Sequence, residues 1–105
     1  MNATTHDITT ATVEVTVGSR DGLHARPAAR VVAFARELNP PAMIARPGGP
    51  QLNPKSLAML LAGDFNYGDH VVVHSVGEGS QASAEALAAL IAEELDRPSN
   101  DGGLA

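Results

Sequence analysis

The segment "GLHARPAA", residues 22–29, carries the residue types best suited to chemistry: a histidine closely followed by an arginine. His24 offers an imidazole that is a competent nucleophile when neutral. A phosphoryl group held on such a ring can be passed on, because the ring nitrogen leaves readily once the imidazole is protonated. Arg26 adds a permanently charged planar donor that matches phosphoryl oxygens. These residues suggest a histidine that accepts phosphate.

The place of His24 at the start of a predicted helix favours the same chemistry. The first N–H groups of a helix lack intrahelical partners and carry partial positive charge, so this end binds anions. With His24 as the N-cap, the donors that can face an anion are the backbone N–H groups of Ala25, Arg26 and Ala28. Pro27 costs little here because it has no N–H to satisfy. The alternative is that His24 is only a cap or a surface residue, and spacing alone does not decide between the two.

The elements that position this segment follow from the spacing of apolar residues. Strict alternation in "TVEVTV", residues 12–17, predicts a strand. Helical spacing predicts a helix from His24 to about Leu38, which "NPP" ends. A short strand in "AMIAR", residues 42–46, a turn in "PGGP" and a stub of partner strand in "QLN" are predicted next.

The second half of the chain continues in the same way. "NPKSLAMLLAG" predicts a short helix capped by Asn53 or Ser56, with Gly63 as a left-handed residue at its end. "DHVVVHSV", residues 69–76, predicts a strand, and an alanine-rich helix is predicted over residues 80–95.

The predicted order is therefore β-α-β-β-α-β-α. Each strand has one strongly apolar side, which favours an α+β open-faced β-sandwich: a four-stranded, mostly antiparallel sheet with three helices on one face. Residues 11–96 form the predicted domain. Residues 1–10 and 97–105 are small, polar and contain glycine or proline, so they are predicted to be disordered tails.

Composition narrows the classes of function. A chain of 105 residues with 44% apolar content suits one domain. A net charge of −5, with one lysine and six scattered arginines, provides no basic stripe for nucleic acid. There is no cysteine and no apolar run near the roughly 20 residues of a membrane span, so we expect a soluble, cytoplasmic protein. His70 and His74 would lie about 13 Å apart on one strand, too far to share a metal ion, and no metal or other cofactor is expected.

"GLHARPAA" and, about thirty residues later, "NPKSL" resemble the HPr family, the histidine-containing phosphocarriers of the bacterial phosphoenolpyruvate-dependent sugar phosphotransferase system. The resemblance covers about residues 11–95. It implies that His24 is phosphorylated on Nδ1 by enzyme I, which takes phosphate from phosphoenolpyruvate, and that it donates to an enzyme IIA-type acceptor. Arg26 would be the active-site arginine. The protein would then be an intermediate in a relay rather than an autonomous enzyme, and we expect a monomer with transient partners.

The second predicted helix gains two roles from the resemblance. Ser56 matches the family's regulatory phosphorylation site, which in some bacteria is modified by a serine kinase, although a serine at a helix start is usually just a cap. Partner docking would use apolar and basic residues near His24. The candidates are Leu57, Ala58, Leu61, Lys55 and Arg30. At position 58 this chain departs from the family, where a larger apolar residue is usual.

Two alternatives stand beside the phosphocarrier. One is a non-catalytic regulatory module of the same fold that binds a transcriptional regulator or enzyme and signals through Ser56, with His24 dispensable. The other is a small-molecule-binding α+β domain, which predicts an apolar pocket and no phosphate uptake. The phosphocarrier is the main hypothesis, because the residue types, the helix end and the resemblance agree.

Overall fold

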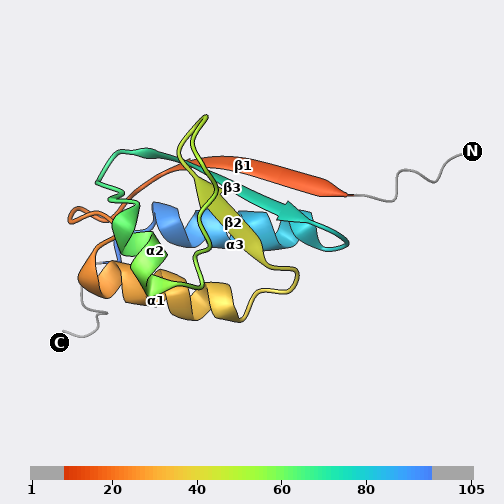
Figure 1. Ribbon diagram of the computed structural model, residues 1–105, viewed down its shortest axis with the longest axis horizontal. Helices are drawn as coiled ribbons and strands as arrows, with labels where there is room; N and C mark the ends of the chain where they lie inside the picture. The colour runs from red at the N-terminus through yellow and green to blue at the C-terminus, as the bar shows by residue number, and fades with distance from the viewer. Residues whose placement is uncertain (1–8, 96–105) are drawn as a thin grey trace, which may run out of the picture.

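Three strands and three helices alternate along residues 9–95, which are the residues that the computed structural model describes (Figure 1). Their order is β1 (Thr10–Thr16), α1 (Ala25–Arg36), β2 (Ala42–Ala45), α2 (Leu57–Ala62), β3 (His70–Val76) and α3 (Ser80–Ala92). β1 thus begins inside the stretch assigned to the N-terminal tail. Thr9 of that stretch is also described, and residues 1–8 and 97–105 of the two predicted tails lie outside the described residues.

β3 is the central strand of an antiparallel sheet with the order β1-β3-β2. In this register Val13 pairs with Val73, and Val15 pairs with Val71. On the other side of β3, Ile44 also lies opposite Val73. Val71, Val73 and Ile44 have no solvent exposure. Cross-strand pairs of β-branched residues stabilise such sheets, and the predicted inward face of each strand is confirmed.

The fourth predicted strand is reduced to a single antiparallel bridge. Leu52 and Ile44 exchange two backbone hydrogen bonds, of 3.0 and 2.7 Å. In an antiparallel ladder, the next residues that would hydrogen-bond to β2 are two positions before and after Leu52. Here these residues are Pro50 and Pro54. Because proline has no N–H, the ladder cannot continue in either direction.

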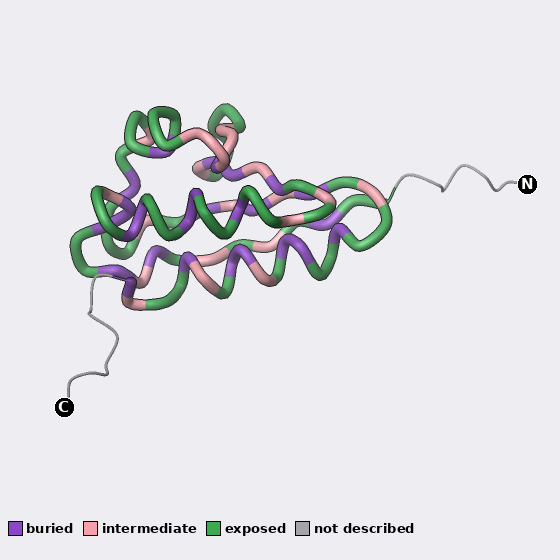
Figure 2. Tube along the Cα trace, turned by 90° about the horizontal axis from the view of Figure 1, so that it is seen from below, coloured by how far each residue is buried: buried purple, intermediate pink, exposed green. Residues whose placement is uncertain are grey.

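The helices form the second layer of the molecule. α3 packs against β1 and β3, α1 lies beside α3, and α2 packs against α1. Figure 2 shows buried positions recurring along the long helices, as the predicted apolar stripes require. In α1 these are Pro27, Ala28, Val31, Val32 and Ala35, and in α3 they are Ser80, Ser83, Ala84, Leu87, Ala88 and Ile91. None of the helices within residues 9–95 has the length and apolar content needed to cross a bilayer.

Gly63 does not adopt the left-handed conformation predicted for it. Its φ is −69°, and the left-handed residue is the next one, Asp64, with a φ of 52°. A Cβ on Gly63 would lie 2.5 Å from Cε2 of Phe65 and 2.8 Å from Cδ1 of Leu52. The glycine is therefore needed because side chains pack directly on its backbone, whereas an aspartate tolerates the left-handed position.

Gly18 joins the end of β1 to α3 and provides a test of this packing. Its N–H donates to the carbonyl of Ile91 at 3.0 Å, and a Cβ there would lie only 1.8 Å from the carbonyl oxygen of Ala92. Since the substitution Gly18→Ala must displace α3 from the sheet, we expect the free energy of unfolding to fall by about 2 kcal/mol or more in urea denaturation.

Gly49→Ala is the matched control, because the nearest atom to a Cβ there is 3.4 Å away. We expect it to change the free energy of unfolding by about 0.5 kcal/mol or less. Equal losses in the two variants would contradict the packing described for Gly18.

Candidate functional site

His24 occupies the N-cap of α1, yet its side chain does not cap the helix. The backbone is extended, with φ −120° and ψ 158°, and the imidazole makes no hydrogen bond to the first turn. The side chain is 36% exposed. The ring is therefore available for contacts other than capping, unlike the serine, threonine and aspartate side chains that usually occupy this position.

The N-terminus of α1 offers fewer backbone donors than predicted. The N–H of Ala28 already donates to the carbonyl of His24, at 3.5 Å, and Pro27 has no N–H. Among the described residues, the N–H groups of Ala25 and Arg26 have no partner. The first turn contains no acidic residue, and Arg26 is exposed. The helix end thus combines two available donors, a partial positive charge and a guanidinium.

The residue after His24 has a strained backbone. Ala25 has a φ of 45°, in the left-handed region that costs a residue with a Cβ roughly 1–2 kcal/mol. Such conformations persist only where the surrounding structure imposes them, and they are concentrated at functional sites. A strained residue thus follows the imidazole directly, where the chain turns into α1.

The segment before α1 is joined to the loop between α2 and β3. The N–H of Leu23 donates to the carbonyl of Phe65 at 2.8 Å, and both side chains are fully buried. Gly22 has a φ of 75°, and a Cβ on it would lie 2.5 Å from that carbonyl oxygen and 3.0 Å from Cδ2 of His24. A glycine is needed here for both reasons, and it lets the imidazole lie against the loop.

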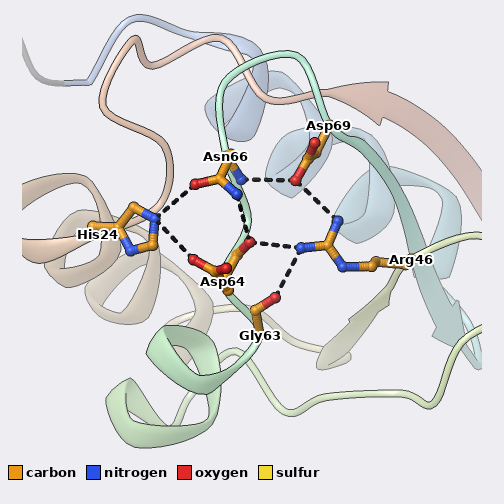
Figure 3. A network of polar contacts seen from close by, with 6 residues as sticks. All are labelled: His24, Arg46, Gly63, Asp64, Asn66 and Asp69. Atoms are coloured by element: carbon orange, nitrogen blue, oxygen red, sulfur yellow. Dashed lines mark hydrogen bonds and ion pairs between the residues drawn. The ribbon is translucent and has the colours of Figure 1, made fainter.

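Two side chains of this loop face the imidazole (Figure 3). Nε2 of His24 lies 3.2 Å from Oδ1 of Asn66 and 3.5 Å from Oδ1 of Asp64. Nδ1 has no hydrogen-bond partner among the described residues. Neither loop residue was singled out by the sequence analysis, because no local pattern connects positions about 40 apart. The ring is thus held by one nitrogen while the other is open.

Arg46 and Asp69 hold the loop between α2 and β3 through hydrogen bonds to its backbone. Arg46 donates to the carbonyls of Gly63 and Asp64, at 2.9 and 2.6 Å, and to Oδ2 of Asp69 at 2.9 Å. The same carboxylate oxygen accepts the backbone N–H of Asn66 at 2.9 Å. That N–H and the Arg46 guanidinium hold the pKa of Asp69 below its ordinary value.

Comparison with known proteins agrees with this geometry. A family model described as "PTS HPr component phosphorylation site" matches residues 11–93. The chain belongs to the HPr family. The phosphocarrier protein HPr of Streptomyces coelicolor is 39% identical over 82 residues, which cover 78% of this chain and 88% of that relative.

Solved HPr structures share the fold. The phosphocarrier protein HPr from Bacillus anthracis aligns with a TM-score of 0.70 and 28% identity, over 78% of this chain and 96% of that one. HPr-C-His from Thermoanaerobacter tengcongensis aligns with a TM-score of 0.73 over 85% of this chain and 99% of that one, and its 24% identity supports the fold alone. The α+β prediction with an antiparallel sheet is thus confirmed.

The docking residues that the HPr resemblance implied on α2 all lie at the surface. Leu57 and Leu61 are 41% and 39% exposed, and Ala58 is exposed as well. Met59 and Phe34 are similarly exposed but were not predicted, because helical spacing by itself does not separate a docking residue from a core residue. α1 and α2 pack against each other, so these exposed apolar side chains lie on two neighbouring helices.

The basic candidates lie in different surroundings. Arg30 is exposed on α1, whereas Lys55 is half-buried and its carbonyl accepts a hydrogen bond from Nε of Arg36 at 3.3 Å. Arg46 is turned towards the loop that contacts His24. The sequence did not indicate this inward role.

The remaining histidines of the described region make other contacts. His70 is exposed, and Nδ1 of His74 lies 3.2 Å from Oγ1 of Thr12. Within residues 9–95 no group of three or more histidine, aspartate or glutamate side chains is placed to hold a metal ion.

Ser56 is the N-cap of α2, which decides between the two predicted caps. Its Oγ accepts the N–H of Met59 at 3.2 Å. Asn53 instead accepts the N–H of Lys55 within the preceding turn, at 3.0 Å. The capping role of Ser56 is thus confirmed, and its phosphorylation stays a prediction.

The cap can be tested by substitution. We expect Ser56→Ala to lower the free energy of unfolding by about 1 kcal/mol, because the donor of Met59 loses its acceptor. Ser56→Asp should stay within about 0.5 kcal/mol of the wild type, since aspartate caps equally well. Urea denaturation measures both, and an alanine variant as stable as the wild type would contradict a stabilising cap.

The lowered pKa of Asp69 predicts a pH dependence of stability. A carboxylate with a lowered folded-state pKa contributes stability above its unfolded pKa and loses it as the pH falls through the folded value. We expect Asp69→Asn to be less stable than the wild type at neutral pH. The difference should shrink below about pH 4 in urea denaturation at a series of pH values. A difference that is independent of pH would contradict this origin.

Proposed function

We propose that this HPr-family protein carries phosphate on His24. It accepts the phosphoryl group from phosphoenolpyruvate-charged enzyme I and passes it to an enzyme IIA-type acceptor for sugar uptake. The observation that carries the proposal is an imidazole at the N-terminus of α1 whose Nε2 is held by the protein while Nδ1 is open. Membership of the HPr family supports it.

The chemistry of each transfer is a displacement at phosphorus. The lone pair of Nδ1 forms the nitrogen–phosphorus bond as the bond from phosphorus to the donor breaks, and the onward transfer reverses these roles. The open N–H groups of Ala25 and Arg26 and the guanidinium of Arg26 can bind the phosphoryl oxygens.

Each exposed contact of this kind contributes only about 0.3–1 kcal/mol. The protein alone therefore provides little stabilisation of a transition state, and the partner enzymes must supply the rest of each active site. This is the reason for describing it as a carrier and not as an autonomous enzyme.

The surface beside His24 suits transient encounters. Leu57, Leu61 and Met59 expose apolar area on α2, and Arg30 and Lys55 provide positive charge on a chain whose net charge is −5. A small apolar patch with a charged rim favours fast association and fast release over a permanent complex. A relay protein needs both, because it must exchange partners after each transfer.

A regulatory role through Ser56 is the second candidate, and one observation favours it. Ser56 is only half-buried and directly precedes the exposed Leu57. A phosphate there would bring a charge of about −1.5 to −2 to the docking surface and repel acidic partners. If this were the sole function, His24 would be dispensable.

Phosphate uptake tests the carrier. We expect the wild type, incubated with enzyme I, magnesium and labelled phosphoenolpyruvate, to gain label that is acid-labile and base-stable, as a phosphohistidine is. His24→Ala should gain none, because the nucleophile is absent. Arg26→Ala should be labelled about tenfold more slowly or worse, since it loses one charged donor.

His70→Ala is the matched control, because His70 is an exposed histidine on β3 remote in sequence from the motif. It should be labelled like the wild type, and circular dichroism should show that all variants are folded. Absence of uptake by the wild type, or label that persists in His24→Ala, would exclude the carrier function.

A further inference from the structure

Asn66 and Asp64 both face Nε2 of His24, and the hydrogen bonds of Asn66 show which of its atoms does so. Nδ2 of Asn66 donates to the carbonyl of Asp64 at 3.2 Å, so the amide oxygen Oδ1 is the group that faces His24 (Figure 3). An amide oxygen only accepts hydrogen bonds. Nε2 of His24, 3.2 Å away, can form this hydrogen bond only as the donor, in the tautomer that carries the hydrogen on Nε2.

Asp64 acts in the same direction. Its Oδ1 lies 3.5 Å from Nε2 and, as an ionised carboxylate, also only accepts. The side chain of Asp64 is 72% exposed, so the ion pair by itself contributes little. The shorter contact to Asn66 is therefore the stronger determinant, and Asp64 adds negative charge on the same side of the ring.

The loop is rigid enough to impose this choice. Arg46 donates hydrogen bonds to two backbone carbonyls of the loop and to the carboxylate of Asp69. Its guanidinium also lies 4.8 Å from the centroid of the buried Phe65 ring. Asp69 in turn holds the backbone N–H of Asn66. These bonds fix the backbone that carries both acceptors, and the bond from Nδ2 to the Asp64 carbonyl also orients the Asn66 side chain.

We propose that Asn66 and Asp64, held in place by Arg46 and Asp69, are positioning residues that keep the proton of His24 on Nε2, so that Nδ1 alone receives the phosphoryl group. This inference rests on the proposed function. In the transfer, the Nδ1 lone pair forms the bond to phosphorus, the bond to the donor breaks with its electron pair, and the Nε2 proton stays in place. The phosphorylated ring is then positively charged, and the Asp64 carboxylate offsets that charge.

The same residues discriminate against the wrong nitrogen. A phosphoryl group on Nε2 would stand next to the carboxylate of Asp64 and would displace the contact to Asn66. On Nδ1, the group is away from these two acceptors. The loop therefore acts both by orienting the ring and by repelling phosphate from its other side.

The first test needs no phosphoryl donor. Nitrogen-15 NMR of the histidine ring, at a pH where the imidazole is neutral, reports which nitrogen is protonated. In the wild type we expect Nε2 protonated and Nδ1 bare. In the double variant Asp64→Ala/Asn66→Ala we expect a mixture, and the bond from the Asn66 backbone to Asp69 should keep that loop folded. A mixed or Nδ1-protonated ring in the wild type would overturn the proposal.

The second test measures transfer. With enzyme I as the donor, the double variant should show kcat reduced about tenfold, equivalent to about 1.4 kcal/mol, with KM little changed because α2 is intact. Part of its phosphate should appear on Nε2 by phosphorus–nitrogen coupling. The single variant Asn66→Asp keeps an acceptor beside Nε2, and its kcat should lie within about twofold of the wild-type value.

Two further variants separate positioning from general damage. Glu78→Gln removes an exposed carboxylate in the turn before α3 and should leave both the tautomer and the transfer rate unchanged. Arg46→Ala keeps Asn66 and Asp64 but removes their support, and it should give a mixed tautomer. A wild-type tautomer in Arg46→Ala would overturn the part assigned to Arg46.

The outcomes also separate this inference from the proposed function. If the wild type shows the expected tautomer but takes up no phosphate, the carrier function fails while the proton assignment holds. If phosphate is taken up on His24 while the double variant keeps a wild-type tautomer and rate, the carrier function holds and the positioning role is excluded.

Discussion

A single backbone hydrogen bond, from the N–H of Leu23 to the carbonyl of Phe65, joins the two segments from which the site is built. Both side chains are fully buried, so separating the segments would leave two polar groups unpaired in the interior and expose a leucine and a phenylalanine. Gly22 permits this contact because it has no Cβ at a point where the loop backbone would collide with one. His24 follows directly, and its ring is therefore brought against the loop by the core and not by a flexible surface contact. The left-handed Ala25 is the local consequence of continuing from this position into α1.

Arg46 has a structural role, although the chain has only seven lysine and arginine residues. Its guanidinium donates to two carbonyls and one carboxylate and lies over the ring of Phe65. A lysine could not satisfy these acceptors in the same way, because it lacks the planar arrangement of several donors. Because Arg46 is engaged by the loop, the positive charge near His24 that a partner could contact comes from Arg26 and Arg30 on α1 and from Lys55. Electrostatic attraction governs the rate of encounter more than affinity, so this distribution bears on which partners are recognised quickly.

α2 connects the exposed leucines to the loop beside His24, although a helix of six residues is not stable by itself. The Ser56 cap fixes its start, the buried Leu60 anchors its inner side, and Gly63 lets its end pack on Phe65. With these attachments in place, Leu57 and Leu61 can remain exposed without loss of the fold. The chain then continues from the helix straight into the loop whose Asp64 and Asn66 contact the imidazole. One continuous segment thus carries the exposed leucines at one end and contacts the His24 imidazole at the other.

Features that depend on neighbours along the chain could be predicted from the sequence. Alternating valines predicted β1, helical spacing predicted the buried stripes of α1 and α3, and the resemblance to the HPr family pointed to His24, Arg26 and the leucines of α2. The strand and the stripes follow from a period within a few residues, whereas the roles expected of His24, Arg26 and the leucines come from the resemblance. Three features depend on the tertiary structure instead. They are the neighbours of Nε2 of His24, the direction of the Arg46 side chain and the need for a glycine at position 63. Asn66 lies 42 residues from His24, and the two meet because buried side chains bring their segments together. No local pattern encodes that meeting, since it depends on how the whole core packs.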